Sequence, residues 1–119
     1  MKNVFEKIVD GEIPSNKVLE NDEFLAFHDI NPKAPIHILI IPKKCYENFQ
    51  ETDPAIMSRM TEFIHEVAIK MGIDKSGYRL ITNCGETAGQ EVMHLHFHML
   101  AGAKLPWDRT SGVNTKDKF

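Results

Sequence analysis

Three histidines alternate with apolar residues in one short segment, Met93-His94-Leu95-His96-Phe97-His98-Met99-Leu100. This period of two is typical of a β-strand, whose successive side chains point to opposite faces of the sheet. We therefore expect one face to carry His94, His96 and His98 and the other to carry Met93, Leu95, Phe97 and Met99. The apolar face can pack on a core. The imidazole face offers groups that act as nucleophile, acid, base or metal ligand near neutral pH.

The other periodicities along the chain predict an α+β domain. A short helix is expected over 3–10. A long helix with one apolar stripe begins at Asp53 and Pro54 and ends at Gly72. Besides the histidine segment, strands are expected over 18–20, 24–28, 37–41 and 78–82. Short connections favour an antiparallel sheet of five strands with the long helix on one face, so that the imidazoles face away from it, toward solvent or a ligand.

Length and composition indicate one domain over residues 1–119. The formal net charge is −3 and basic residues occur in pairs at most, which argues against a nucleic-acid partner. No apolar run approaches the ~20 residues of a membrane span, and no signal-peptide stretch begins the chain, so we expect a cytoplasmic protein that does not contact membranes. Cys45 and Cys84 are expected to be free thiols, with one disulfide between them as the alternative.

Four interpretations of the histidine row are open. The rings could be packing residues, although each buried ring would need a polar partner. Two of them could share Zn²⁺, with His37 or His28 completing the set. One neutral imidazole could attack phosphorus, with backbone N–H groups of the loop 83–91, which contains Gly85 and Gly89, holding the phosphate. The same pocket could instead bind a nucleotide in a regulatory module, with hydrolysis incidental.

The histidine segment resembles the signature of the histidine triad (HIT) superfamily, which reads His, apolar, His, apolar, His, apolar, apolar. Further segments match the HINT-like branch in order and spacing, namely 5–14, 26–32, 34–44 and 89–92. The resemblance implies a HIT-like α+β fold that pairs its sheets in a homodimer and needs no cofactor or metal. It also implies a hydrolase of purine nucleoside 5′-phosphoramidates, the amides of AMP or GMP, that works through a nucleotidyl-histidine intermediate.

The resemblance also implies roles for individual residues. His96 would be the nucleophile, His98 would contact the phosphate or the leaving group, and His94 and His37 would support them. Asp29 would accept hydrogen bonds from the ribose hydroxyls. The phosphate would be held by Asn83, Gly89, Gln90, Glu91 and Val92. The base pocket and a C-terminal contact to the partner subunit would be formed by Phe5, Ile8, Phe27, Ile30 and Trp107.

Several of these residues also have a purely structural interpretation. Asp29 could cap its loop, Asn83 could serve a turn, and Trp107 could anchor a dimer without contacting the site. Ile8 and Phe27 could belong to the core alone.

The chain departs from the HINT-like pattern at two places. Many members carry a Cys-x-x-Cys pair where this chain has Asn3 and Glu6, so we expect no structural zinc there. Many members carry serine where this chain has Glu91. A carboxylate near a phosphate costs about 1 kcal/mol at 4 Å in water and more where water is excluded. We therefore expect the Glu91 side chain to turn away and only its backbone N–H to be used, which leaves the substrate range open.

Overall fold

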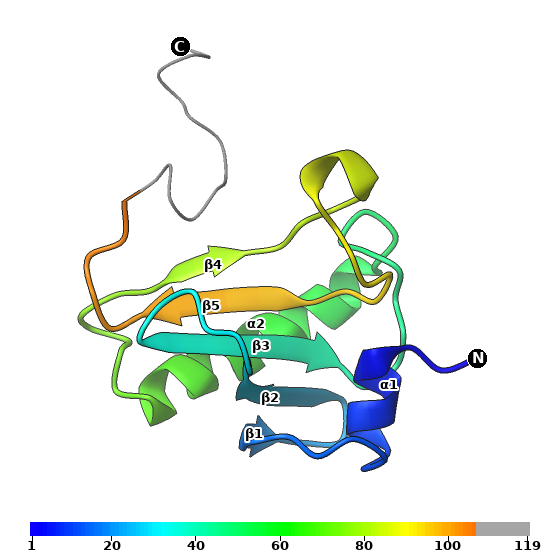
Figure 1. Ribbon diagram of the computed structural model, residues 1–119, viewed down its shortest axis with the longest axis horizontal. Coiled ribbons are helices and arrows are strands. Elements are labelled where there is room, and N and C mark those ends of the chain that lie inside the picture. The colour runs from blue at the N-terminus through cyan, green and yellow to red at the C-terminus, as the bar shows by residue number, and fades with distance from the viewer. Residues whose placement is uncertain (107–119) are drawn as a thin grey trace.

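The computed structural model describes residues 1–106, so that Trp107 lies outside the described residues. Its centre is one antiparallel sheet with the strand order β1-β2-β3-β5-β4 (Figure 1). The elements are α1 (Val4–Val9), β1 (Lys17–Glu20), β2 (Phe24–His28), β3 (Ile36–Pro42), α2 (Pro54–Lys70), β4 (Arg79–Ile81), the 3₁₀-helix η1 (Glu86–Ala88) and β5 (Phe97–Ala101). The predicted α+β class and five-stranded antiparallel sheet are confirmed, with strand bounds that mostly differ by one residue.

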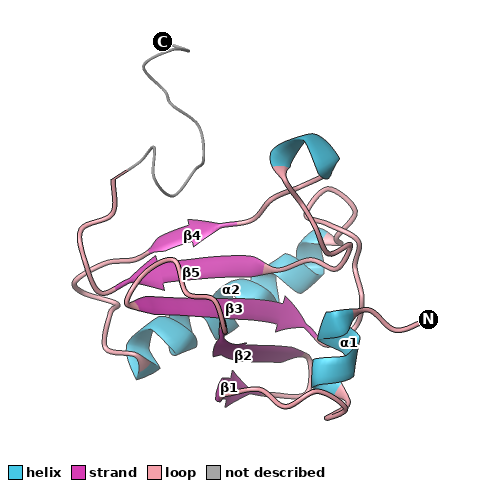
Figure 2. Cartoon of the chain, in the orientation of Figure 1, coloured by secondary structure: helices cyan, strands magenta, loops and turns pink. Residues whose placement is uncertain are grey.

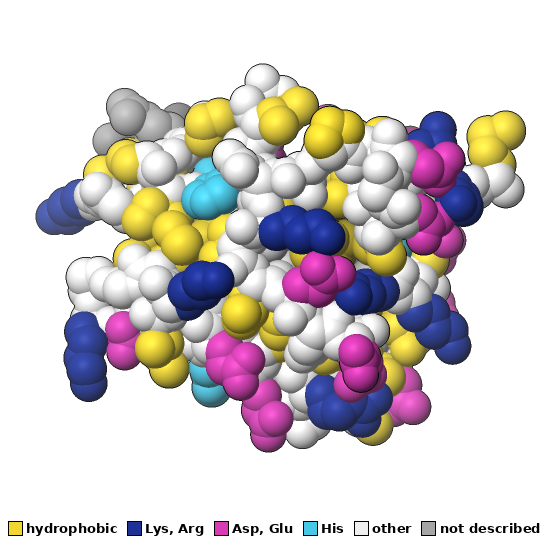
Figure 3. Space-filling view, turned by 90° about the horizontal axis from the view of Figure 1, so that it is seen from below, with side chains coloured by type: hydrophobic (Ala, Val, Ile, Leu, Met, Phe, Trp, Pro, Cys, Tyr) yellow, Lys and Arg dark blue, Asp and Glu magenta, His cyan; other side chains and the backbone are white. Residues whose placement is uncertain are grey.

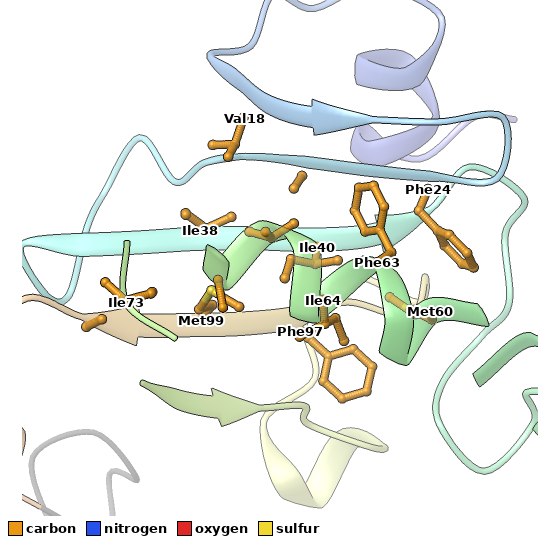
Figure 4. Close-up of a cluster of buried hydrophobic side chains, with 14 of the residues drawn as sticks. Val18, Phe24, Ile38, Ile40, Met60, Phe63, Ile64, Ile73, Phe97 and Met99 are labelled. Atoms are coloured by element: carbon orange, nitrogen blue, oxygen red, sulfur yellow. The ribbon is translucent and has the colours of Figure 1, made fainter. Parts of the chain in front are cut away.

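The long helix α2 covers one face of the sheet and lies behind it in Figure 1. It begins as predicted, because Asp53 is the N-cap, its carboxylate accepts the N–H of Ala55 at 2.9 Å, and Pro54 follows. Its apolar stripe packs on inward-facing strand residues to form the main core (Figure 4). This core includes Phe24, Ile38, Ile40, Met60, Phe63, Ile64, Val67, Phe97 and Met99.

The short helix α1 partly covers the opposite face of the sheet. Phe5 and Ile8 pack there in a second cluster of buried apolar residues. The strands contribute Leu25, Phe27, Leu39 and Ile41 to this cluster. Because alternate residues of β2 and β3 enter different clusters, the centre of the sheet is buried on both faces. The face toward α1 is the one that carries the histidines.

The histidine segment is less regular than predicted, because β5 begins only at Phe97. His94 and His96 precede the strand in an irregular stretch. Leu95 donates its backbone N–H to the carbonyl of Tyr46 at 2.6 Å, outside the strand ladders of the sheet. The backbone therefore leaves the regular ladder before the first two histidines are reached.

The alternation of side chains nevertheless persists through this irregular stretch. Leu95, Phe97 and Met99 all lie in the core against α2. Met93 is the exception, since the prediction placed it on the core face and its side chain is 45% exposed. It stands before the point at which Leu95 enters the core, so no strand neighbour covers it.

The connection from β4 to β5 carries η1 and stands out at the upper right of Figure 2. Cys45 and Cys84 are exposed free thiols, as expected. Acidic and basic side chains are interspersed over the face shown in Figure 3, in keeping with the small net charge. None of the helices within residues 1–106 has the length and apolar character that crossing a bilayer requires.

Candidate active site

The register of β3 and β5 brings two of the predicted histidines together. Leu39 pairs with His98, and His37 pairs with Leu100, so the two histidines are diagonal neighbours on one face. His37 Nε2 and His98 Nδ1 are 2.9 Å apart. The backbone N–H of Lys33 donates to His37 Nδ1 at 3.0 Å, so the proton of His37 is on Nε2 and is donated to His98. Neutral His98 then carries its own proton on Nε2.

The other two histidines are fixed by backbone carbonyls. His94 Nε2 lies 2.8 Å from the carbonyl oxygen of Pro42, which can only accept, so Nε2 carries the proton. His96 Nδ1 lies 2.8 Å from the carbonyl oxygen of His94 and donates to it. The remaining nitrogen of His96, Nε2, therefore holds a lone pair, and no hydrogen bond to it occurs within residues 1–106.

The row thus places an unprotonated imidazole nitrogen on His96 beside a ring whose Nε2 is a donor. The ring centroids of His96 and His98 are 5.2 Å apart. A lone pair and an N–H in adjacent rings are what a nucleophile and an anion-binding donor require.

The row is more buried than the sequence predicted. His94 is 0% and His96 is 8% exposed, because α1 lies over them. The ring of Phe5 is 5.7 Å from that of His94 and 4.9 Å from that of His96, measured between centroids. The expectation that all three imidazoles face solvent or a ligand is therefore wrong for His94.

Burial also determines the charge of the four histidines of the candidate site. It lowers the pKa of His37, His94 and His96 below the ordinary value of 6.5. Burial, together with the neighbouring rings of His96 and His37, lowers the pKa of His98 to about 4. All four rings are therefore neutral at pH 7, and the lone pair on His96 is available without prior deprotonation.

Asp29 lies beside the pair of His37 and His98. One carboxylate oxygen is 3.4 Å from His37 Nε2, and the other accepts the N–H of Asn31 at 2.7 Å. Potential ligand atoms of Asp29, His37 and His98 lie within 4.8 Å of one another, so this group has donors that a cation could use. Coordination by His37 Nε2 would move its proton to Nδ1, where the N–H of Lys33 already points. The described hydrogen bonds therefore oppose a metal at this position.

Gln90 supports the loop between β4 and β5 and is itself buried. Its side-chain oxygen accepts the N–H of Gly85 at 2.8 Å. Its side-chain nitrogen donates to the carbonyls of Glu47 at 2.7 Å and of Val92 at 3.0 Å. All of these bonds are internal, so the side chain holds the loop in place instead of offering an open contact to a ligand.

Only some of the predicted phosphate donors are open. The backbone N–H of Gly89 donates to Glu86 and that of Gln90 donates to Gly85, so both are already used. Within residues 1–106, the backbone N–H groups of Glu91 and Val92 and the half-buried side chain of Asn83 make no hydrogen bond. The Glu91 residue is exposed.

Three of the predicted base-pocket residues lie together. Phe5, Ile8 and Phe27 belong to the cluster under α1, and Phe5 also contacts the row. Ile30, in contrast, is 91% exposed and lies outside that cluster. It follows β2 at the start of a proline-containing loop that carries it away from the core.

Sequence reasoning did not assign a role to Asn3 beyond the loss of a cysteine. Asn3 is the N-cap of α1, and its side-chain nitrogen lies 3.1 Å from His94 Nδ1. The signal was available, because asparagine followed three residues later by glutamate is a capping-box pattern. The contact to His94, 91 residues away, could not be read from that pattern.

Comparison with known proteins identifies relatives over most of the chain. The family described as HIT domain matches residues 10–105. An uncharacterized HIT-like protein of Helicobacter pylori is 59% identical over 102 residues, which are 86% of this chain and 98% of that protein. A solved HIT family hydrolase from Clostridium thermocellum is 44% identical with a TM-score of 0.84, covering 89% of this chain and 96% of its own. A solved hypothetical histidine triad nucleotide-binding protein from Sulfolobus tokodaii is 34% identical with a TM-score of 0.75, covering 82% and 67%.

Proposed function

The chain belongs to the HIT domain family, and on this premise we propose that it hydrolyses the P–N bond of purine nucleoside 5′-phosphoramidates. One observation carries the proposal: a buried, neutral His96 keeps a lone pair on Nε2, and its neighbour His98 holds a proton on Nε2. A hydrolase among its solved relatives, the Clostridium thermocellum protein, supports the general class.

In the first step, the lone pair of His96 Nε2 forms a bond to the phosphorus of the nucleotide. The P–N bond of the substrate breaks, and its electron pair leaves on the amine, which takes up a proton delivered through water. His98 Nε2–H donates to a phosphate oxygen and stabilises the charge that develops there. The product of this step is a nucleotidyl group bound to His96.

In the second step, a water oxygen attacks the same phosphorus. The bond from phosphorus to His96 Nε2 breaks, and its electron pair returns to the ring as the lone pair. One proton of the water replaces the proton taken up by the amine. The sum is a nucleoside 5′-monophosphate plus an amine, formed from the phosphoramidate and one water molecule.

Other residues suit the rest of such a substrate. The side chain of Asn83 and the backbone N–H groups of Glu91 and Val92 are the open donors for phosphate oxygens. The free acceptor capacity of Asp29 suits ribose hydroxyls. Phe5, beside the row, suits contact with the base.

The test measures amine release from AMP phosphoramidate by the wild-type protein and by His96→Ala and His96→Asn. We expect both variants to lose at least about 10³-fold in kcat, since covalent attack becomes impossible. His65→Asn, which changes an exposed histidine on α2, is the matched control and should retain full activity. Intact-protein mass after rapid mixing should show one nucleotidyl group on the wild type and none on either His96 variant.

The alternative, a purine nucleotide-binding module, makes the opposite prediction for turnover. It expects AMP to bind tightly while amine release stays at the uncatalysed rate. That result, or unchanged turnover in His96→Ala, would overturn the proposed hydrolase. Calorimetric titration with AMP, run beside the amine assay, separates the two functions in one set of samples.

A further inference from the structure

Asn3 connects the helix α1 to the histidine row through both ends of its side-chain amide. Its Oδ1 accepts the backbone N–H of Glu6 at 2.8 Å, which is the capping bond of α1. The Glu6 carboxylate in turn accepts the backbone N–H of Asn3 at 3.0 Å. Because Oδ1 must face the helix, the orientation of the amide is fixed, and Nδ2 points away from α1.

The Nδ2 group points at the buried ring of His94. It lies 3.1 Å from His94 Nδ1 and 3.6 Å from the sulfur of Cys45. His94 Nε2 donates to the carbonyl of Pro42, so Nδ1 is an acceptor and takes its hydrogen from Asn3. No other hydrogen bond to His94 Nδ1 occurs within residues 1–106.

The next link runs from His94 to His96. The carbonyl oxygen of His94 accepts the Nδ1–H of His96 at 2.8 Å and leaves the lone pair on the other nitrogen. Phe5, two residues after Asn3, makes edge contacts with the rings of His94 and His96. The first residues of α1 and its N-cap therefore contact His94 through Asn3 and contact both His94 and His96 through Phe5.

We propose that Asn3 is a positioning residue that holds His94 in its neutral Nε2–H form beside His96 and thereby keeps a positive charge away from the proposed nucleophile. Its effect on catalysis rests on the proposed function, whereas its effect on the His94 tautomer does not. Asparagine fits this place because the same amide accepts from the helix and donates to the ring. Aspartate would cap the helix equally well but would present only acceptors to His94.

Titratable groups lie around His94 and Asn3 on the elements packed there. Glu6 on α1 and His96 in its own segment act on His94 directly, and Cys45 in the loop after β3 contacts Asn3 and the carbonyl oxygen of Met93. The Glu6 carboxylate favours a positive His94 and the His96 ring opposes it, while burial keeps the pKa of His94 low. With these groups unchanged, a carboxylate introduced at position 3 acts on His94 from the side that now supplies a hydrogen.

The decisive variant is Asn3→Asp, studied by ¹⁵N NMR of the imidazole nitrogens between pH 5 and pH 8. In the wild type, we expect His94 to be the neutral Nε2–H tautomer at neutral pH, because burial lowers its pKa. In Asn3→Asp, the new carboxylate should draw a proton onto Nδ1, since Nε2–H is retained by Pro42. The pKa of His94 should then rise by about 1–3 units, as for a carboxylate in contact with a histidine.

Asp53→Asn is the matched control, because it makes the reverse exchange at the N-cap of α2. It should leave the His94 signals and kcat unchanged. Thermal unfolding of Asn3→Asp should stay close to that of the wild type, which shows that α1 keeps its cap. Its kcat for the phosphoramidate should fall about tenfold or more with KM little changed, because a positive His94 opposes the positive charge that the neighbouring His96 ring acquires when its Nε2 bonds to phosphorus.

The outcomes separate this inference from the proposed function. A wild-type His94 protonated on Nδ1, or an Asn3→Asp variant with an unmoved His94 pKa, would overturn the role of Asn3 whatever the activity. A shifted His94 with unchanged kcat would overturn its effect on the proposed nucleophile. A wild type without phosphoramidase activity would overturn the proposed function, and the ¹⁵N titration would still decide the tautomer.

Discussion

At the scale of single residues, each histidine of the row is fixed by a neighbour with only one hydrogen-bonding role. Pro42 can only accept, and the backbone N–H of Lys33 can only donate. Pro42 sets the proton position on His94 and Lys33 sets those on His37 and His98, while the carbonyl oxygen of His94 sets the proton position on His96. The geometry therefore sets chemical roles that residue types alone leave open.

The low pKa of His98 makes the stability of the protein depend on pH. Its pKa is about 4 in the folded protein and 6.5 in an unperturbed chain, so between these values the unfolded chain binds more protons. The free energy of unfolding therefore decreases as pH falls through this window. We expect the stability advantage of the wild type over His98→Gln to shrink from pH 7 to pH 4, measured by thermal unfolding in steps of pH.

His65→Gln is the control for that experiment, because His65 is exposed on α2. Its difference from the wild type should change much less over the same range. A difference between wild type and His98→Gln that stays constant from pH 7 to pH 4 would contradict the lowered pKa.

The hydrogen bond from Lys33 to His37 leads to a prediction about metals. Because His37 Nδ1 is held as an acceptor, its Nε2 keeps a proton and cannot donate a lone pair to an ion. We expect amine release from the phosphoramidate to be unchanged after exhaustive treatment with a chelator. A loss of turnover that is restored by adding back Zn²⁺ would contradict this interpretation of the group around His37.

At the scale of secondary structure elements, hydrophobic periodicity predicted the features that depend only on which face of an element is buried. The stripe of α2 and the alternation in the histidine segment follow from burial of one face, so the helix and the core face of that segment were predictable. The late start of β5 at Phe97 was not predictable, because it depends on the bond between Leu95 and Tyr46. Such contacts join residues far apart in sequence and leave no local pattern.

The candidate site divides in the same way. Alternation in the sequence predicted that the three histidines share one face. The family resemblance added His37 to the candidate site. The register of β3 and β5 brings His37 next to His98. The burial of His94 under α1 and the use of Gln90 as an internal support were not predicted. Both depend on how a short helix and a loop fold back over the sheet.

Gln90 provides a test at the scale of the loop between β4 and β5. Gln90→Met keeps the length of the side chain but leaves Gly85 N–H and two carbonyl groups without their partner. We expect a loss of about 1–3 kcal/mol in the free energy of unfolding, from urea denaturation, because buried polar groups become unsatisfied. Affinity for AMP in calorimetric titration should also weaken, since the loop carries the open phosphate donors.

Gln50→Met is the matched control, because Gln50 is exposed and lies outside this loop. It should change neither stability nor AMP affinity by a measurable amount. Equal effects of the two substitutions would show that Gln90 has no special part in holding the loop.

At the scale of the whole molecule, the two faces of one sheet have different roles, one in the core and one in the candidate active site. Its face toward α2 is wholly apolar at the centre and supplies the main core. Its other face combines a smaller apolar cluster with the histidine network. The apolar side of the fold therefore supports the polar side. His37 and His98 are held on strands, and His96, in the irregular stretch before β5, is held by its bond to the carbonyl oxygen of His94.

The two outer strands of the described sheet differ in how they are protected, and this difference predicts how two copies pair. β1 carries Lys17 and Glu20 and pairs with β2 in an irregular register, and these features discourage edge pairing. β4, in contrast, exposes Leu80 at 40%.

We expect a dimer at micromolar concentration in which the β4 strands of two copies pair. We expect Leu80→Lys to shift this dimer to monomer, because like charges would meet where the two strands pair. Ile69→Lys, which changes an exposed apolar residue on α2, should remain dimeric. Sedimentation velocity distinguishes these states, and a wild-type monomer, or a Leu80→Lys dimer as tight as the wild type, would contradict pairing through β4.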